Sequence, residues 1–392
     1  MTPVDHKVKH QSTVPANYGE EIELFVRQYK GGSNARPVLM LHGRSTPALA
    51  GLDLVLQEGN PPQPNTKYSW AQFLAGKGFD VFVMDLQGSG RSHRPKMDDP
   101  CNANPTQRDL LNPNPGTGTC SPTANYPNQL GNAKSDWDEL GTVVTFIRGL
   151  CNNQKVAFIG WSAASLAMAP YALQNPTHVS SLFLLGPVFP PNGPWSTKPS
   201  APFDPPPGTS LPLQPVSKPA AVFGFPMNLT SKDSFTAVIS DANLAEQVWQ
   251  NVMASDDEGR KWGGTVPGAP EGVMRWRNTY WWGWNDHTVG HGSTLGNAVP
   301  VCIVYGDQDT TANTPEALGQ LHISVPKLYA KIPGKDKLMF RVEGWDHYPV
   351  WERKPAQVLQ HMSWKWLDGK KVYGVERGSW LMDPNNVLTE VV

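Results

Sequence analysis

The chain has 392 residues, of which 17% are charged and 39% hydrophobic, and its formal net charge is -1. This length suits one large α/β domain with a sizeable insertion, or two domains. A charge so close to zero offers no electrostatic surface for nucleic acid or for an anionic membrane, and no apolar run approaches the roughly 18–20 residues that a membrane span needs.

The cellular compartment stays open from the sequence. Residues 1–21 lack the apolar segment of a signal peptide, so we expect a cytoplasmic protein if Met1 is native and a secreted or periplasmic one if a leader was removed. Cys101 and Cys120 share one Pro/Asn/Gly-rich segment, where they form either a disulfide that braces a long loop or two free thiols. The remaining cysteines, Cys151 and Cys302, form no CxxC pair, and we expect no structural zinc site.

Short apolar runs alternate with helical patterns along the chain, as is typical of a parallel sheet covered by helices. Strands are predicted, in chain order, at residues 38–41, 81–84, 156–159, 182–185, 302–305 and 338–342. Helices are predicted from residue 70 to about 76, over 135–150 with Ser135 as the cap, directly after residue 159, and over 355–367.

Three long stretches interrupt this alternation, at residues 45–67, 92–134 and 188–298. Loops of this length in a compact domain are usually functional or disordered. The third stretch lies between two core strands and carries a predicted helix over 234–255. We predict that residues 188–298 form a cap over the carboxyl edge of the sheet, where ligands bind in open α/β folds. The core would then comprise residues 1–187 and 299–392.

The segment VAFIGWSAAS, residues 156–165, runs from a buried strand through a tight turn into a helix. Small residues at 160 and 164 allow the backbone to double back and expose Ser162 at the tip of the turn, which is the context of a nucleophilic serine. The following helix N-terminus would stabilise negative charge there. The alternative is that Ser162 only caps an ordinary strand–helix turn.

The segment LHGRS, residues 41–45, resembles the oxyanion loop of α/β-hydrolases. This resemblance implies that the backbone N–H groups of Arg44 and Ala163 hold the oxyanion of a tetrahedral intermediate. His42 is expected to be structural. The Arg44 guanidinium either reaches a carboxylate, carbonyl or sulfonyl group of a substrate or points to solvent.

Two further segments resemble the same superfamily. Residues 81–92 resemble its DxxGxGxS segment, in which Asp85 and Arg91 are expected to pin a loop. In VYGDQD, residues 304–309, the family pattern places the catalytic acid three residues after the glycine, which selects Asp309 over its rival Asp307. The preceding strand is followed by no carboxylate that could take this part.

The segment VEGWDHYPVWE, residues 342–352, resembles the closing Gly-x-x-His of the superfamily and makes His347 the expected base. The alternative is an ordinary loop histidine. The chain order Ser162, Asp309, His347 is the order that this fold uses. The resemblance covers residues 20–187 and 299–368, which is the core without the cap. It implies an α/β-hydrolase fold with a mostly parallel sheet flanked by helices.

The same resemblance implies a serine carboxylesterase that cleaves esters of small, apolar or aromatic substrates through an acyl-enzyme. Serine at the nucleophile position argues against epoxide hydrolases and haloalkane dehalogenases, which use aspartate there. A lactonase or C–C bond hydrolase on the same triad, and a non-catalytic binding protein, stay open. We expect no metal and no organic cofactor. The expected partner is a small-molecule ester, and homodimer formation stays open.

Tryptophans supply the candidate pocket wall. A cluster in the predicted cap contains Trp276, Tyr280 and three further tryptophans. The cluster forms either a wall for an apolar or aromatic substrate or a small cap core. The pocket candidates are Trp161, Trp281, Trp282 and Trp284.

Overall fold

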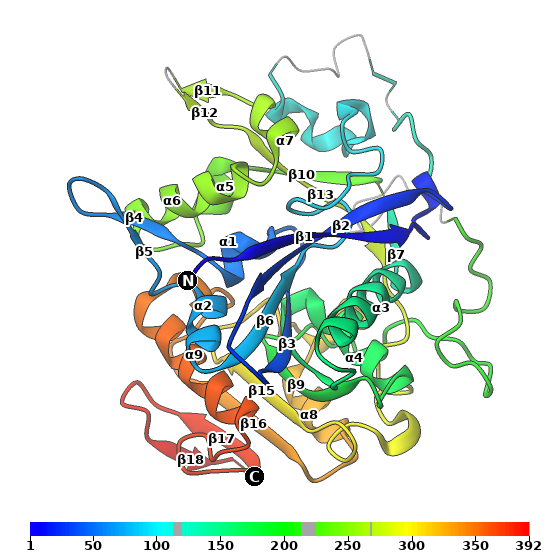
Figure 1. Ribbon diagram of the computed structural model, residues 1–392. Coiled ribbons are helices and arrows are strands. Elements are labelled where there is room, and N and C mark those ends of the chain that lie inside the picture. The colour runs from blue at the N-terminus through cyan, green and yellow to red at the C-terminus, as the bar shows by residue number, and fades with distance from the viewer. Residues whose placement is uncertain (113–119, 122, 213–224, 267–268, 392) are drawn as a thin grey trace.

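The computed structural model describes all residues except 113–119, 122, 213–224, 267–268 and 392. Within the described residues, a ten-stranded sheet runs through the molecule in the order β1-β2-β6-β3-β8-β9-β15-β16-β17-β18 (Figure 1). The strands from β6 to β17 are parallel to their neighbours, and both edges are antiparallel. The sheet comprises β1 Val4–Gln11, β2 Glu21–Tyr29, β6 Phe79–Met84, β3 Arg36–Leu41, β8 Val156–Trp161, β9 Val179–Leu185, β15 Val301–Gly306, β16 Lys337–Val342, β17 Gly378–Met382 and β18 Leu388–Glu390.

Every strand predicted from an apolar run lies inside one of these observed strands, and the predicted fold class is confirmed. The sequence prediction missed the outer strands β1, β2, β17 and β18. The residues of β1 alternate largely between exposed and buried, β17 is mostly half-exposed and β18 is mostly exposed. Outer strands of this kind lack the continuous apolar run that marks a central parallel strand.

Helices cover both faces of the sheet (Figure 1). One hydrophobic cluster packs α1, α2 and α9 against the sheet, and a second packs α3, α4 and α8. The bounds are α1 Ala48–Leu52, α2 Trp70–Gly76, α3 Ala133–Leu150, α4 Ser165–Gln174, α8 Val325–Lys331 and α9 Arg353–Leu367. No helix in the described ranges is both long and apolar enough to cross a bilayer.

Helix α3 begins two residues before the predicted start. Asn132, not Ser135, is its N-cap, and the two residues form a capping box in which each side chain accepts the other's backbone N–H at 3.0 Å. Both residue types cap helices well. The sequence therefore could not tell which of the two stands at the cap.

Helices α5 to α7 and strands β10 to β13 of the predicted cap segment lie above one end of the sheet in Figure 1, whereas Trp282, Trp284, Val289 and Leu295 pack in the cluster of α3, α4 and α8. The predicted single helix over 234–255 is two helices, because Asp241 starts the second one by accepting the backbone N–H groups of Asn243 and Leu244. The segment 188–298, called the cap below, contains β10 Met227–Ser231, α5 Lys232–Thr236, α6 Ala242–Met253, α7 Asp257–Lys261, β11 Thr265–Val266, β12 Ala269–Pro270, β13 Val273–Arg277 and β14 Thr279–Tyr280.

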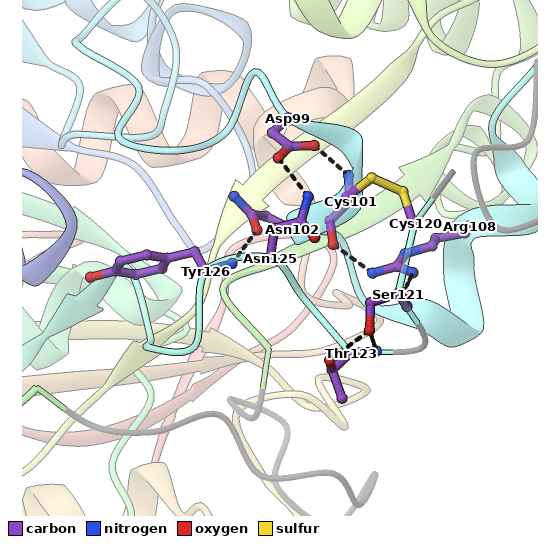
Figure 2. Close-up of a disulfide and its surroundings, with 9 residues drawn as sticks. All are labelled: Asp99, Cys101, Asn102, Arg108, Cys120, Ser121, Thr123, Asn125 and Tyr126. Atoms are coloured by element: carbon purple, nitrogen blue, oxygen red, sulfur yellow. Dashed lines mark hydrogen bonds between the residues drawn. A yellow bond between two sulfur atoms is a disulfide. The ribbon is translucent and has the colours of Figure 1, made fainter. Parts of the chain in front are cut away.

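The second long connection, residues 92–134, joins this layer. Its strand β7, Gly131–Asn132, pairs with β14, and its apolar side chains share a small cluster with β10 and β13. Cys101 and Cys120 form a disulfide there, as one of the two predicted alternatives had it (Figure 2). Arg108 donates to the carbonyls of Cys101 at 2.5 Å and Ser121 at 2.7 Å. The first connection, residues 45–67, contains a small hairpin of β4, Leu56–Glu58, and β5, Gln63–Asn65.

Candidate active site

Ser162 stands directly after β8, at the carboxyl end of a central strand, and has a positive φ of 57°. A non-glycine residue in this region is strained and must be held by its surroundings. Gly160 makes the turn possible, because a Cβ there would lie 3.0 Å from the Met168 sulfur and 3.1 Å from the Ala164 Cβ. Trp161, not Ser162, occupies the cap position of the short helix that follows.

The Ser162 side chain contacts the His347 ring, and the His347 ring contacts the Asp309 carboxylate. His347 Nε2 lies 2.8 Å from Ser162 Oγ, and His347 Nδ1 lies 2.8 Å from Asp309 Oδ2. Since a carboxylate only accepts hydrogen bonds, Nδ1 carries the proton and Nε2 accepts the serine hydroxyl. All three residues are buried.

The His347–Asp309 pair is held from several sides. The second carboxylate oxygen of Asp309 accepts the backbone N–H groups of Thr311 and Ala312 at 3.0 and 2.8 Å. Trp161 donates its indole N–H to the His347 carbonyl at 3.1 Å. Asp307, the rival acid, accepts the Gly344 N–H at 2.8 Å and so braces the histidine loop without touching the ring.

Gly186 is a site residue that the sequence analysis missed. It follows β9 with a φ of 48°, and a Cβ there would lie 2.9 Å from Asp309 Oδ2 and 3.1 Å from His347 Nδ1. The available signal was a glycine immediately after a buried strand, next in the sheet to the nucleophile strand. Only glycine combines this backbone conformation with this close approach.

The loop after β3 packs against Ser162. A Cβ on Gly43 would lie 3.2 Å from the Ser162 Cβ. His42 Nδ1 donates to the Gly43 carbonyl at 2.6 Å, and its Nε2 accepts the Leu86 N–H at 3.3 Å. Burial lowers the pKa of His42, which favours this neutral form. His42 is thus structural, as expected, and fixes the loop that carries Arg44.

A small cavity of about 40 Å³ opens beside the serine turn. Arg44, Ala163 and Asp136 line it from the core, and Trp276 and Trp281 line it from the cap. Both predicted oxyanion residues therefore face one space next to Ser162.

The predicted tryptophan wall needs a correction. Trp281 lines the cavity and donates its indole N–H to Asp136 at 2.9 Å. Trp282 and Trp284 are only 2% and 1% exposed and pack in the hydrophobic cluster of α3 and α4. Trp161 is 2% exposed and holds the histidine loop through its hydrogen bond to the His347 carbonyl. The cluster in the sequence thus divides between a pocket wall and a core.

The sequence profile of the family described as alpha/beta hydrolase fold matches residues 36–354. The chain belongs to this family. Among solved structures, it is similar to a thermophilic esterase from Thermogutta terrifontis, with 15% identity, a TM-score of 0.47, and coverage of 93% of this chain and 98% of the other.

Two further solved structures are similar to this α/β-hydrolase. A serine hydrolase from Cycloclasticus zankles has 14% identity and a TM-score of 0.48, with 93% and 99% of the two chains covered. A 2-hydroxy-6-oxo-6-phenylhexa-2,4-dienoate hydrolase from a Rhodococcus strain has 16% identity and a TM-score of 0.45, with the same coverage. A comparison with curated proteins found no match.

A buried ion network joins the cap of this α/β-hydrolase to its core. Arg277 of β13 pairs with Asp136 at 2.6 Å and with Glu139 at 2.9 Å, both on α3. Glu139 also accepts the Gln87 N–H at 2.8 Å, next to the loop that His42 holds. Burial raises the pKa of Asp136 to about 6, while Arg277 opposes the shift. Sequence reasoning placed no function on these residues, because only the fold brings β13 against α3.

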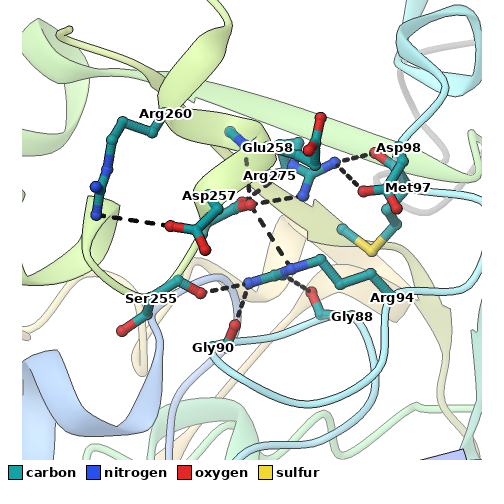
Figure 3. A network of polar contacts seen from close by, with 12 residues as sticks. Gly88, Gly90, Arg94, Met97, Asp98, Ser255, Asp257, Glu258, Arg260 and Arg275 are labelled. Atoms are coloured by element: carbon teal, nitrogen blue, oxygen red, sulfur yellow. Dashed lines mark hydrogen bonds and ion pairs between the residues drawn. The ribbon is translucent and has the colours of Figure 1, made fainter.

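A second ion network ties the cap to the loop after β6 (Figure 3). Arg275 of β13 pairs with Asp256 at 2.6 Å and with Asp98 at 3.0 Å. Arg94 lies 3.6 Å from the same Asp256 carboxylate and donates to the Ser255 carbonyl at 2.7 Å. Two separate networks therefore fix β13, which carries Trp276 to the cavity.

Asp85 and Arg91 lie in the loop after β6 and contact each other. Asp85 accepts the backbone N–H groups of Ala48 at 2.8 Å and Arg91 at 3.0 Å, and so pins its loop as expected. The described part of the chain contains no cluster of three or more His, Cys, Asp or Glu residues that could hold a metal ion.

Proposed function

We propose that this α/β-hydrolase cleaves carboxylic esters through an acyl-enzyme, with Ser162 as nucleophile, His347 as base and Asp309 as the acid that orients the base. One observation carries the proposal. The Ser162 hydroxyl lies 2.8 Å from an imidazole nitrogen whose partner nitrogen lies 2.8 Å from a buried carboxylate. This is the arrangement that activates a serine hydroxyl for acyl transfer.

The reaction would follow from this geometry. His347 Nε2 takes the Ser162 proton as the oxygen attacks the ester carbonyl, and it then returns that proton to the departing alcohol. Water repeats the sequence on the acyl-enzyme and releases the acid. The backbone N–H groups of Arg44 and Ala163 would stabilise the oxyanion, and one such donor contributes roughly 3–4 kcal/mol to the transition state.

The surroundings of the triad support a small ester with an apolar or aromatic alcohol group. The departing alcohol must lie near His347, where the Tyr348 ring centroid is 5.3 Å from the imidazole and stacks on Trp351 at 5.6 Å. Aromatic faces of this kind bind apolar groups well. The cavity next to Arg44, about 40 Å³, favours a short acyl group.

Hydrolysis of p-nitrophenyl acetate and butyrate, measured beside a lactone panel, tests the proposal. Ser162→Ala should lower kcat by roughly 10⁴-fold or more, as removal of a triad serine does. Ser180→Ala, at an exposed position of β9, is the matched control and should keep wild-type activity. A fluorophosphonate probe should label the wild type and not Ser162→Ala. Near wild-type turnover in Ser162→Ala would refute the assignment, and a strong preference for lactones would favour the lactonase alternative.

A further inference from the structure

His42 fixes the direction of the peptide group that carries the Arg44 N–H. The carbonyl oxygen of this group belongs to Gly43 and accepts the His42 Nδ1 proton at 2.6 Å. The peptide bond is trans, and in a planar trans peptide the carbonyl and the N–H point in opposite directions. Holding the carbonyl on one side therefore decides where the N–H, one of the two proposed oxyanion donors, points on the other side.

The loop after β6 holds His42 in turn. His42 Nε2 accepts the Leu86 N–H at 3.3 Å. The next backbone N–H, that of Gln87, donates to Glu139 Oε2 at 2.8 Å, and the Gln87 side-chain amide donates to Glu139 Oε1 at 3.1 Å. Both Gln87 and Glu139 are buried. One carboxylate of α3 thus fixes the backbone and the side chain of Gln87, next to the residue that binds His42.

A cap residue completes the surroundings of the Glu139 carboxylate. Arg277 Nη1 of β13 donates to Glu139 Oε1 at 2.9 Å, and both side chains are buried. The backbone leaves room for this arginine, because a Cβ on Gly88 would lie 3.1 Å from Arg277 Cδ and one on Gly131 would lie 3.2 Å from Arg277 Nε. A buried carboxylate that loses its cation is strongly destabilised. Without Arg277 we therefore expect Glu139 to take up a proton or to move away from Gln87.

We propose that Glu139 and Arg277 are positioning residues for the oxyanion donor of Arg44. Their ion pair fixes the loop after β6, that loop fixes His42, and His42 fixes the peptide group that donates to the oxyanion. This inference rests on the proposed esterase function. It gives the cap, through β13, a part in the chemical step in addition to its place over the site.

An ester and its thionoester together measure the alignment of the oxyanion donors. p-Nitrophenyl acetate places a developing oxyanion between the donors, whereas p-nitrophenyl thionoacetate places a sulfur there, which is larger and accepts hydrogen bonds weakly. Misalignment of one donor should therefore slow the ester more than the thionoester. Because both substrates need the same triad, the ratio of their kcat/KM values within one variant isolates the donors.

Two substitutions break the ion pair from its two sides. Glu139→Gln and Arg277→Met should each lower kcat for the ester by about 10- to 100-fold, since loss of a whole oxyanion donor lowers kcat by about 10²- to 10³-fold. KM should change much less, and the ester-to-thionoester ratio should fall together with kcat. Arg277→Lys keeps the charge and should restore part of both values. Glu139→Gln is nearly isosteric and carries the test if Arg277→Met does not fold.

Asp256→Asn is the matched control, because it breaks the other buried ion pair of β13, the one with Arg275. This variant should keep the wild-type ratio of ester to thionoester. A wild-type ratio near one, an unchanged ratio in Glu139→Gln and Arg277→Met, or an equal fall in Asp256→Asn overturns the inference. Ester hydrolysis that depends on Ser162 would then still support the esterase proposal, whereas a wild type that hydrolyses neither substrate would refute that proposal itself.

Discussion

Around the triad, three glycines matter as much as the catalytic side chains, because an added Cβ at each would contact its neighbours too closely. Gly43, Gly160 and Gly186 each stand where a Cβ would meet Ser162, the helix after it or the His347–Asp309 pair. Ser162 itself carries the strained positive φ. The close packing of backbone against these side chains keeps hydroxyl, imidazole and carboxylate in contact, and a shift of about 1 Å is enough to weaken such an arrangement.

Gly186→Ala tests this at the residue scale. Its methyl group would lie within 3.1 Å of both His347 Nδ1 and Asp309 Oδ2, so we expect kcat for p-nitrophenyl acetate to fall by about 10- to 100-fold. Gly369→Ala is the control, because Gly369 also has a positive φ, 66°, but nothing lies within 4 Å of the added Cβ. The Gly369→Ala variant should have a lower free energy of unfolding and an unchanged kcat. Equal losses of kcat in the two variants would show that backbone strain, not contact with the pair, is responsible.

Asp136 makes stability depend on pH. Its pKa is raised from 3.8 to about 6 in the folded protein, chiefly by burial. The folded state therefore holds this proton more tightly, and the contribution of Asp136 to the free energy of unfolding falls as the pH rises from about 4 to above 6. A shift of this size corresponds to about 3 kcal/mol.

Urea unfolding of the wild type and Asp136→Asn at pH 4 and pH 7 measures this effect. The asparagine does not titrate, so the stability of the wild type relative to the variant should decrease between pH 4 and pH 7 by up to about 3 kcal/mol. A constant or increasing difference would mean that burial does not raise the pKa of the Asp136 carboxyl.

At the scale of elements, strand β13 decides where the cap meets the core. Its Arg275 and Arg277 enter two different buried networks, while Trp276 between them reaches the cavity. Trp276 and Arg277 both line the cavity, so one short strand both anchors the cap and supplies a pocket wall. Neighbouring α7 contributes through its N-cap, Asp256, which also pairs with Arg275.

Asp256→Asn should loosen this anchor. The carboxylate is 4% exposed and pairs with Arg275 at 2.6 Å, and breaking a buried ion pair costs about 3–5 kcal/mol. The adjacent Asp257→Asn is the control, because its side chain is 88% exposed and its nearest arginine is 3.9 Å away. That variant should stay within about 0.5 kcal/mol of the wild type. Thermal unfolding and limited proteolysis of residues 225–266 would compare the two, and similar stability of both variants would argue against the anchor.

At the scale of the whole molecule, one sheet places the triad and two separate chain segments cover it. Parallel strands bring the ends of β8, β9, β15 and β16 to one edge, from which Ser162, Gly186, Asp309 and His347 follow. The covering layer combines residues of the 188–298 insertion with the 92–134 connection, which the Cys101–Cys120 disulfide closes on itself.

The disulfide should stabilise the whole protein. It closes a loop with a sequence separation of 19 residues. A cross-link over a loop of about this length raises the free energy of unfolding by about 3 kcal/mol, because it restricts the unfolded chain. Dithiothreitol should therefore lower the Tm of the wild type and not that of a Cys101→Ser/Cys120→Ser variant. Thiol titration of the unfolded, unreduced wild type should find only Cys151 and Cys302. Four reactive thiols would contradict the bridge.

The sequence by itself determined the local pieces of this protein. Apolar runs marked the central strands, and the residues around Ser162, Asp309 and His347 carried recognisable patterns, because strand burial and tight turns constrain adjacent residues. Only the tertiary structure decided which distant residues meet. Gly186, the Asp136–Arg277 pair and the division of Trp281 from Trp282 and Trp284 depend on how β9, β13 and α3 pack. Contacts between segments far apart in the chain leave no periodic signal in either segment, so they become visible only when the sheet and its cap assemble.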